Sequence, residues 1–319
     1  MKNNLLTTII VVWSMVAAFA QNNIKESEIA LKTKNCKIYG TLKVPKTQEK
    51  IPLVLIIAGS GATDRNCNNP MMTCNSYKIL SDSLNLYGIA TLSYDKRMIA
   101  KSVSTQKEEE LRFEDYVEDA KKWIELLSKN KQFSEIIVIG HSEGSLIGII
   151  ACGDNPQVSK FISISGVGVS ADEILKEQLS NNLEGEKRLK AKAFSIIDEL
   201  KQGKLVEDVP ITLHSLFRPS VQPYLISWFK YNPQEEIKKL SIPILILQGT
   251  LDIQVSEYEA ELLYSGNSNA KKVIIEDMNH ALKNSTSMDM KEQFEDSYNN
   301  PNSPINTILV ETIVGFLKK

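Results

Sequence analysis

Short, continuous apolar runs that alternate with helix-like segments constrain this chain more than any other feature. Residues 53–58 (LVLIIA), 135–140 (EIIVIG) and 243–249 (PILILQG) lack the polar–apolar alternation of a strand with one solvated face. Runs of this kind are typical of strands buried on both faces of a sheet. Such strands are joined by crossover helices, so we expect an α/β protein with a mostly parallel sheet and helices on both faces.

The remaining pattern predicts eight strands. Residues 28–33 and 37–44 indicate an opening hairpin, and further strands are expected at 53–58, 89–94, 135–140, 160–165, 243–249 and 272–276. Helices are expected at 76–87, 113–129, 142–152 and 305–317, where apolar residues recur at helical spacing or small residues dominate.

One long segment interrupts the alternation. Residues 166–240 contain no convincing buried strand, and 171–201 indicates one or two amphipathic helices. An insertion of this size predicts a helical cap on a core formed by 21–165 and 241–319. Its aromatic residues, such as Trp228, either contact substrate or pack the cap onto the core, and packing is the more common role.

The first twenty residues predict a secretory signal peptide. Lys2 precedes an apolar run over 5–20 that ends in Ala18-Phe19-Ala20, before the polar Gln21. A basic start, an apolar stretch and a small-x-small site are typical of cleaved leaders. We therefore expect a periplasmic or secreted protein without stable membrane insertion once 1–20 is removed, and an uncleaved anchor is the alternative.

Composition and cysteine spacing narrow the possible functional classes and binding sites. A formal net charge of -2 offers no basic surface for nucleic acid. The four cysteines contain no C-x₂-C pair, so neither a zinc site nor another metal centre is expected. Disulfides persist outside the cytosol, and Cys67 and Cys74 share one polar loop, so they form either a disulfide or a pair of free thiols. Nothing in the pattern indicates an oligomeric state.

The segment Gly140-His141-Ser142-Glu143-Gly144 fits G-x-S-x-G and stands between a predicted strand and a predicted helix. This context is the one a nucleophile elbow requires, because a sharp strand-to-helix turn exposes the serine hydroxyl. Ser142 is therefore the candidate nucleophile, and a tight turn without chemistry is the alternative.

A serine needs a base, and the base needs a carboxylate. The chain has 3 histidines, and His280 follows the last predicted strand, whereas His141 and His214 are assigned packing or surface roles. Asp252 follows the strand at 243–249, and the order Ser142, Asp252, His280 is the order of α/β-hydrolases. Asp277 and Asp95 are weaker candidates for the carboxylate.

An oxyanion hole needs two backbone N–H groups. One is expected from Glu143, which follows the nucleophile. The other is expected from the loop Gly59-Ser60-Gly61, with Ser60 the first choice and Gly61 the second. This loop lacks the glycine spacing of a dinucleotide or phosphate loop.

With these residues together, the chain resembles the α/β-hydrolase superfamily, in particular its exported serine esterase and serine aminopeptidase-like branch. Residues 59–66 (GSGATDRN) are similar to an oxyanion-loop signature of esterase-like members, and 94–97 (YDKR) resembles the segment after the fourth strand. Many members have glycines after that arginine, where this chain has Met98 and Ala100. The resemblance implies hydrolysis of an acyl ester through an acyl-enzyme, without metal or organic cofactor.

Three functional hypotheses follow. The first is a carboxylic-ester hydrolase for small or medium acyl esters, with Asp64 and Arg65 as possible substrate contacts or, more simply, structural groups. The second is a peptidase or acyltransferase with the same triad. An acidic anchor for a peptide amine in the cap would favour the peptidase. The third is a non-catalytic binding protein, which is disfavoured because all three triad roles can be filled.

Overall fold

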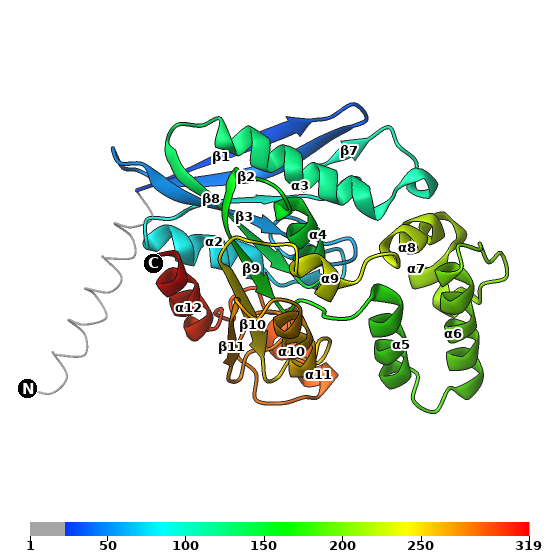
Figure 1. Cartoon of the computed structure of the whole chain (residues 1–319). Helices are drawn as coiled ribbons and strands as arrows, with labels where there is room; N and C mark the ends of the chain where they lie inside the picture. The colour runs from blue at the N-terminus through cyan, green and yellow to red at the C-terminus, as the bar shows by residue number, and fades with distance from the viewer. Residues whose placement is uncertain (1–22, 319) are drawn as a thin grey trace, which may run out of the picture.

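The computed structural model describes residues 23–318, so the expected leader over 1–20 lies outside the described residues. Within them, nine strands form one sheet, eight on the continuous path β1-β2-β6-β3-β8-β9-β10-β11 and β7 paired with β2 (Figure 1). The strands are β1 (Ile24–Lys32), β2 (Cys36–Pro45), β3 (Ile51–Ile57), β6 (Ala90–Tyr94), β7 (Val103–Ser104), β8 (Phe133–His141), β9 (Val158–Ile164), β10 (Ile244–Gly249) and β11 (Lys271–Ile275).

The sheet is antiparallel at one edge and parallel elsewhere. The opening hairpin pairs β1 with β2, and β2 pairs antiparallel with β6. From β6 through β3, β8, β9 and β10 to β11, neighbouring strands run parallel. This arrangement confirms the mostly parallel eight-strand path expected from the apolar runs, with β7 as a short addition.

Helices cover both faces of the sheet because the central strands bury both faces. On β3, Leu53, Leu55 and Ile57 belong to one hydrophobic core, whereas Val54 and Ile56 belong to the other. The first core includes α3 (Phe113–Ser128), α4 (Glu143–Cys152) and α10 (Glu257–Gly266). The second includes α2 (Ser76–Leu86) and α12 (Thr307–Leu317).

The segment over 166–240 supplies helices and no sheet strand. It contains α5 (Ala171–Asn182), α6 (Lys187–Lys201), α7 (His214–Phe217), α8 (Gln222–Trp228) and α9 (Pro233–Ile237), with 3-10 turns η2 (Ile211–Leu213) and η3 (Pro219–Val221). Helices α5 to α8 extend to one side of the sheet, whereas α9 lies against the core and contacts α4 and α10 (Figure 1). Phe217, Tyr224 and Phe229 join the core that also contains α3 and α4.

Several elements were absent from the sequence expectations. Strands β4 (Asn68–Asn69) and β5 (Met72–Thr73) form a small separate hairpin between β3 and α2. Helix α10, the turn η1 (Glu108–Glu110), α11 (Met290–Gln293) and the π-helical turn η4 (Phe294–Tyr298) complete the described chain. Among the described helices, none is long and apolar enough to cross a bilayer.

Candidate active site

A cavity lies where the parallel strands end and the strand order reverses. Strands β6 and β8 flank β3 on opposite sides, and ligands of open α/β sheets bind at the carboxyl ends beside such a reversal. The cavity holds about 250 Å³. It is lined by Gly59, Ser60, Thr63, Cys67, Asn69, Met72, Cys74, Tyr77, His141, Ser142, Gln254, His280, Ala281 and Tyr298.

Ser142 occupies a strained turn between β8 and α4. Its φ of 55° and ψ of -124° are unusual for a residue with a side chain. The turn is possible because both flanking glycines permit close approach. A Cβ on Gly140 would lie 2.2 Å from the Gly144 carbonyl oxygen, and one on Gly144 would lie 2.4 Å from the Ile57 carbonyl oxygen. The sequence pattern therefore folds as the sharp strand-to-helix turn that a nucleophile elbow requires, and Ser142 faces the cavity.

His280 and Asp252 are in direct contact. The distance from His280 Nδ1 to Asp252 Oδ2 is 2.8 Å, and both residues are buried. The amides of Gln254 and Val255 donate to Asp252 Oδ1 over 2.8 and 2.9 Å. Burial alone raises the pKa of Asp252, but the His280 imidazole and these donors outweigh it and lower the pKa below its ordinary value. Asp252 is therefore ionised at neutral pH and can orient the imidazole.

The loops that carry these two residues are tied together by the backbone. Leu251 donates its N–H to the Met278 carbonyl over 3.0 Å. A Cβ on Gly249, the last residue of β10, would lie 2.0 Å from the same carbonyl oxygen. Glycine at the end of β10 is thus required for the close approach that brings Asp252 to His280. Ser142 and His280 line the same cavity, although no hydrogen bond joins them within the described structure.

His141 is not a surface residue but lies at the centre of the site. Its Nε2 is 3.0 Å from the His280 carbonyl oxygen, which can only accept, so Nε2 carries the proton. Its Nδ1 therefore accepts from the Tyr77 hydroxyl over 2.8 Å, and that hydroxyl accepts from the Gly59 N–H over 3.1 Å. Burial, aided by the neighbouring His280, lowers the pKa of His141 to about 3. His141 is a neutral link between the oxyanion loop and the His280 loop.

Ser60 and Gly61, the two oxyanion-loop candidates, differ in their position relative to the cavity. Both are exposed, but Ser60 lines the cavity and Gly61 does not. Glu143 is the first residue of α4, where backbone N–H groups lack helical partners. In the part of the chain that the structure describes, the amides of Ser60 and Glu143 have no hydrogen-bond acceptor. These two amides can therefore serve a developing negative charge.

The proposed substrate contacts lie elsewhere. Arg65 donates to Asp95 over 2.7 Å and to Glu28 over 3.3 Å, and Asp64 accepts from loop amides, so both residues stabilise their own surroundings. Trp228 stacks on Phe113 with ring centroids 6.0 Å apart. Of the residues described as lining the cavity, none is Asp64, Arg65 or Trp228. Loop amides hold Asp64, ion pairs hold Arg65, and ring stacking holds Trp228.

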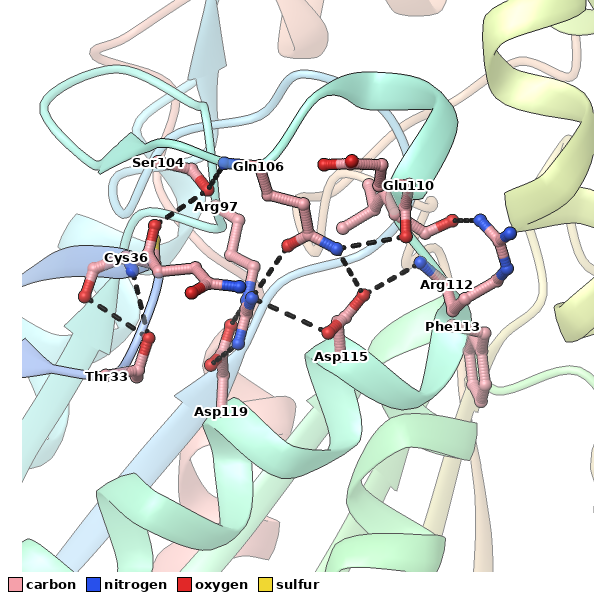
Figure 2. Close-up of polar contacts among 12 residues, drawn as sticks. Thr33, Cys36, Arg97, Ser104, Gln106, Glu110, Arg112, Phe113, Asp115 and Asp119 are labelled. Atoms are coloured by element: carbon pink, nitrogen blue, oxygen red, sulfur yellow. Dashed lines mark hydrogen bonds and ion pairs between the residues drawn. The ribbon is translucent and has the colours of Figure 1, made fainter.

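Arg97, in the segment after β6, has a structural role. Its guanidinium donates to both carboxylate oxygens of Asp119 on α3 and, over 2.9 Å, to Gln106, so it connects three segments (Figure 2). Met98 and Ala100 adopt φ values of 62° and 47°. The loop thus keeps the left-handed conformation that glycine favours, although both residues carry side chains.

The disulfide considered for Cys67 and Cys74 is not formed in this structure. Both are buried free thiols that interact with each other, and both line the cavity. The Cys67 contact, helped by Ser76 and Lys283 against the effect of burial, lowers the pKa of Cys74 to about 6. No group of three or more His, Cys, Asp or Glu side chains within the described residues is arranged to hold a metal ion.

Comparison with known proteins places this geometry in a family. The family model described as serine aminopeptidase, S33, matches residues 71–286, which contain the elbow, Asp252 and His280. The chain belongs to the serine aminopeptidase S33 family. Esterase EstD of Thermotoga maritima is 26% identical to this S33 chain over 268 residues, which are 76% of the chain and 57% of that protein. The chain therefore spans little more than half the length of this relative.

Solved structures similar to the S33 chain share its fold. Est1E from Butyrivibrio proteoclasticus, in a structure with ferulic acid bound, has a TM-score of 0.62 and 16% identity, covering 91% of this chain and 100% of that one. The Pyrococcus furiosus esterase Pf2001 has a TM-score of 0.61 and 16% identity, covering 92% and 91%. These similarities identify the α/β-hydrolase fold.

Sequence reasoning missed several residues of the site. Tyr77 and Tyr298 reach the cavity from α2 and η4, and Met72 reaches it from the β4–β5 hairpin. No local pattern marks them, because their role depends on segments that meet only in the folded chain. Lys96, whose Nζ donates to the Gly59 carbonyl oxygen, was also missed. It had one signal, its place beside Asp95 and Arg97 in the segment that resembles other α/β-hydrolases.

Proposed function

We propose that this S33-family chain is a serine hydrolase that cleaves carboxylic esters of small or medium acyl groups through an acyl-enzyme. The observation that carries the proposal is the strained Ser142, which faces the same cavity as a His280 bonded to an ionised Asp252. The names of the relatives, which are esterases, support the same reaction class.

In this reaction the Ser142 hydroxyl attacks the ester carbonyl and His280 accepts its proton. Asp252 stabilises the resulting imidazolium, which then protonates the leaving alcohol. Water repeats the sequence on the acyl-enzyme and releases the acid. The contact between nucleophile and base is often looser in a free enzyme than in its substrate complex, so attack requires Ser142 and His280 to close on the bound ester.

The negative oxygen formed in each step needs donors that are already in place. The amides of Ser60 and Glu143 flank Ser142 and have no other acceptor in the described chain. The N-terminus of α4 adds a favourable dipole at the same position. We assign these two amides to the oxyanion hole.

The cavity favours an ester over a peptide with a free amine. An aminopeptidase must bind a substrate ammonium group, whose desolvation requires a compensating carboxylate. Among the described residues that line the cavity, none is Asp or Glu. This favours the ester hydrolase over the peptidase, which remains the alternative to be tested.

The test compares the mature protein with Ser142→Ala on p-nitrophenyl esters from acetate to dodecanoate and on aminoacyl p-nitroanilides. We expect ester hydrolysis that Ser142→Ala reduces by at least about 1,000-fold. His214→Gln is the matched control, because His214 bonds the Val209 carbonyl outside the cavity. Faster cleavage of the anilides than of the esters would replace this proposal with the peptidase, and turnover retained in Ser142→Ala would exclude the triad.

We also propose that the protein is exported and that its mature chain begins at Gln21. The support is the sequence alone, through Lys2, the apolar run over 5–20 and Ala18-Phe19-Ala20. Expression of the full chain in a bacterial host, followed by cell fractionation and intact-mass measurement, should give a periplasmic or secreted product that starts at Gln21. An Ala20→Arg variant should remain unprocessed. A wild-type product that keeps residues 1–20 in the cytoplasm would contradict export.

A further inference from the structure

A buried lysine contacts both sides of the oxyanion hole. Lys96 follows β6 and is 3% exposed. Its Nζ donates to the Gly59 carbonyl oxygen over 2.5 Å and lies 3.5 Å from Glu143 Oε2. It also lies 5.4 Å from the centre of the Tyr116 ring. The ammonium group is therefore enclosed by a carbonyl, a carboxylate and an aromatic face.

The contact with Gly59 fixes an oxyanion donor. The Gly59 carbonyl and the Ser60 N–H belong to the same planar peptide group, in which the two bonds point in opposite directions. When Lys96 holds the carbonyl on the buried side, the Ser60 N–H is turned to the other side, where Ser60 lines the cavity. Without that hold, rotation of this peptide group would remove the donor from the site.

The contact with Glu143 fixes the residue that supplies the other donor. Glu143 is 4% exposed, and its carboxylate pairs with Lys96 and accepts from the Tyr224 hydroxyl of α8. The Glu143 side chain is thus anchored on the buried side, while its N–H stands at the start of α4. Burial lowers the pKa of Lys96, and the Glu143 carboxylate opposes that effect.

We propose that Lys96 is a positioning residue that sets both oxyanion amides through the Gly59 carbonyl and the Glu143 carboxylate. The inference rests on the proposed ester hydrolysis and deepens it. A buried ion pair is a weak source of stability and can often be replaced by apolar side chains at little cost. Its placement behind two catalytic amides gives it a functional reason to be charged.

The experiment compares Lys96→Met, the double variant Lys96→Met/Glu143→Gln, and Lys43→Met. The double variant removes the carboxylate that Lys96→Met would leave buried and unpaired, so that it keeps the fold. Lys43 is the matched control, because it is a buried lysine on β2 whose ammonium pairs with Asp82 instead. Thermal unfolding is measured for each variant beside kcat and KM for p-nitrophenyl acetate.

A second readout does not depend on ester turnover. A fluorophosphonate reacts with the serine hydroxyl, loses fluoride and leaves a phosphonyl oxygen in the oxyanion position, so its labelling rate reports the same two amides. We expect kcat and the labelling rate to fall about 100-fold in Lys96→Met and in the double variant, with KM within about threefold of wild type. Lys43→Met should keep both rates.

The outcomes distinguish the positioning role of Lys96 from the proposed ester hydrolysis. A folded double variant with wild-type kcat and labelling rate would overturn the positioning role of Lys96 while leaving the ester hydrolase intact. If the wild-type protein is labelled but hydrolyses no ester, the carboxylic-ester proposal fails, and the labelling rates still decide the role of Lys96. A wild-type protein that is not labelled at all would overturn both.

Discussion

At the scale of single residues, Asp252 is held in place by hydrogen-bond donors other than His280. The amides of Gln254 and Val255 donate to one of its oxygens, and the Gln248 side-chain amide donates to the other over 3.1 Å. An anchored carboxylate keeps the imidazole in one tautomer, with the proton on Nδ1 and the lone pair on Nε2, as the proposed role of His280 as base requires.

Asp252→Asn should therefore reduce kcat while preserving the fold. The asparagine oxygen can still accept from the two backbone amides, but its NH₂ group would face His280 and favour the wrong tautomer. We expect kcat to fall by about 1,000- to 10,000-fold. Steady-state kinetics on p-nitrophenyl acetate, with thermal unfolding to verify folding, makes the measurement. A folded variant with less than a tenfold loss would show that Asp252 does not orient His280.

His141 gives the molecule a stability that depends on pH. Burial lowers its pKa to about 3, whereas in the unfolded chain it titrates near 6.5, so the unfolded state binds more protons between these values. Stability from this residue is therefore present above about pH 6.5 and lost as the pH falls toward 3. Tyr77, His280 and Asp252 are the polar or charged groups that act on it.

His141→Gln should weaken this dependence, since glutamine does not titrate. Between pH 7.5 and pH 5 the free energy of unfolding of the wild type should fall by about 2 kcal/mol more than that of the variant. Urea unfolding at both pH values gives the comparison. Equal losses in the two proteins would mean that His141 is protonated in the folded state at pH 5.

The sequence was sufficient to select the residues that local context marks. Ser142 stands between a strand and a helix, and Asp252 and His280 each follow a strand, so their places at one edge of the sheet could be predicted. The choice between Ser60 and Gly61 could not be made, because it depends on the rotation of one peptide group. Lys96 contacts that peptide group only in the folded chain, so the spacing of residues in the sequence does not indicate the contact.

At the scale of elements, the β4–β5 hairpin is the part of the site that the sequence pattern did not indicate. Each strand has only 2 residues, and the Asn68 side chain accepts from the amides of Cys74 and Asn75 to close the turn. A period of two cannot be recognised over so short a run. Central strands such as β3 and β10 were found because a sheet buried on both faces requires long apolar runs.

The hairpin register predicts a disulfide under oxidising conditions. Asn68 pairs with Thr73, so Cys67 and Cys74 occupy the next opposed position. Opposed Cα atoms in antiparallel strands are about 4.5–5.5 Å apart, which a disulfide can span. Oxidised glutathione would accept the two electrons of the Cys67 and Cys74 thiols and would be released as two molecules of reduced glutathione. By chain entropy alone, the bridge would stabilise the fold by about 2.5 kcal/mol.

Peptide mass mapping after alkylation without reductant tests this prediction. After incubation with oxidised glutathione, the wild type should show a linked Cys67–Cys74 peptide and a higher melting temperature than the reduced protein. A Cys67→Ser/Cys74→Ser variant should melt at the same temperature with and without the oxidant. Two alkylated cysteines at 67 and 74 after oxidation would contradict the prediction.

At the scale of the whole molecule, the cavity is enclosed by segments on either side of the nucleophile. The β4–β5 hairpin, the loop after β10 with Gln254, and η4 with Tyr298 supply its walls. The aromatic residues of 166–240 that belong to the core instead pack toward α3 and α4. Helical periodicity identified the segment over 166–240 but could not say which part of the core it contacts. Polar links from this segment include the Tyr224 hydroxyl, which donates to the Glu143 carboxylate, and the Gln178 side chain, which donates to the Gln254 carbonyl oxygen over 3.0 Å.

If the protein is the proposed ester hydrolase, this arrangement predicts that it prefers short acyl chains. The cavity holds about 250 Å³, and the half-buried Tyr298, whose hydroxyl accepts from Gln254 over 3.1 Å, closes one wall. We expect kcat/KM for p-nitrophenyl butyrate to exceed that for dodecanoate by at least about tenfold, a difference of about 1.4 kcal/mol in transition-state binding.

Tyr298→Ala opens the wall and should reduce this ratio of kcat/KM values. Trp228→Phe is the control, because Trp228 packs on Phe113 and should leave the ratio unchanged. A ratio that responds to Trp228→Phe and not to Tyr298→Ala would place the acyl group beneath the 166–240 segment instead.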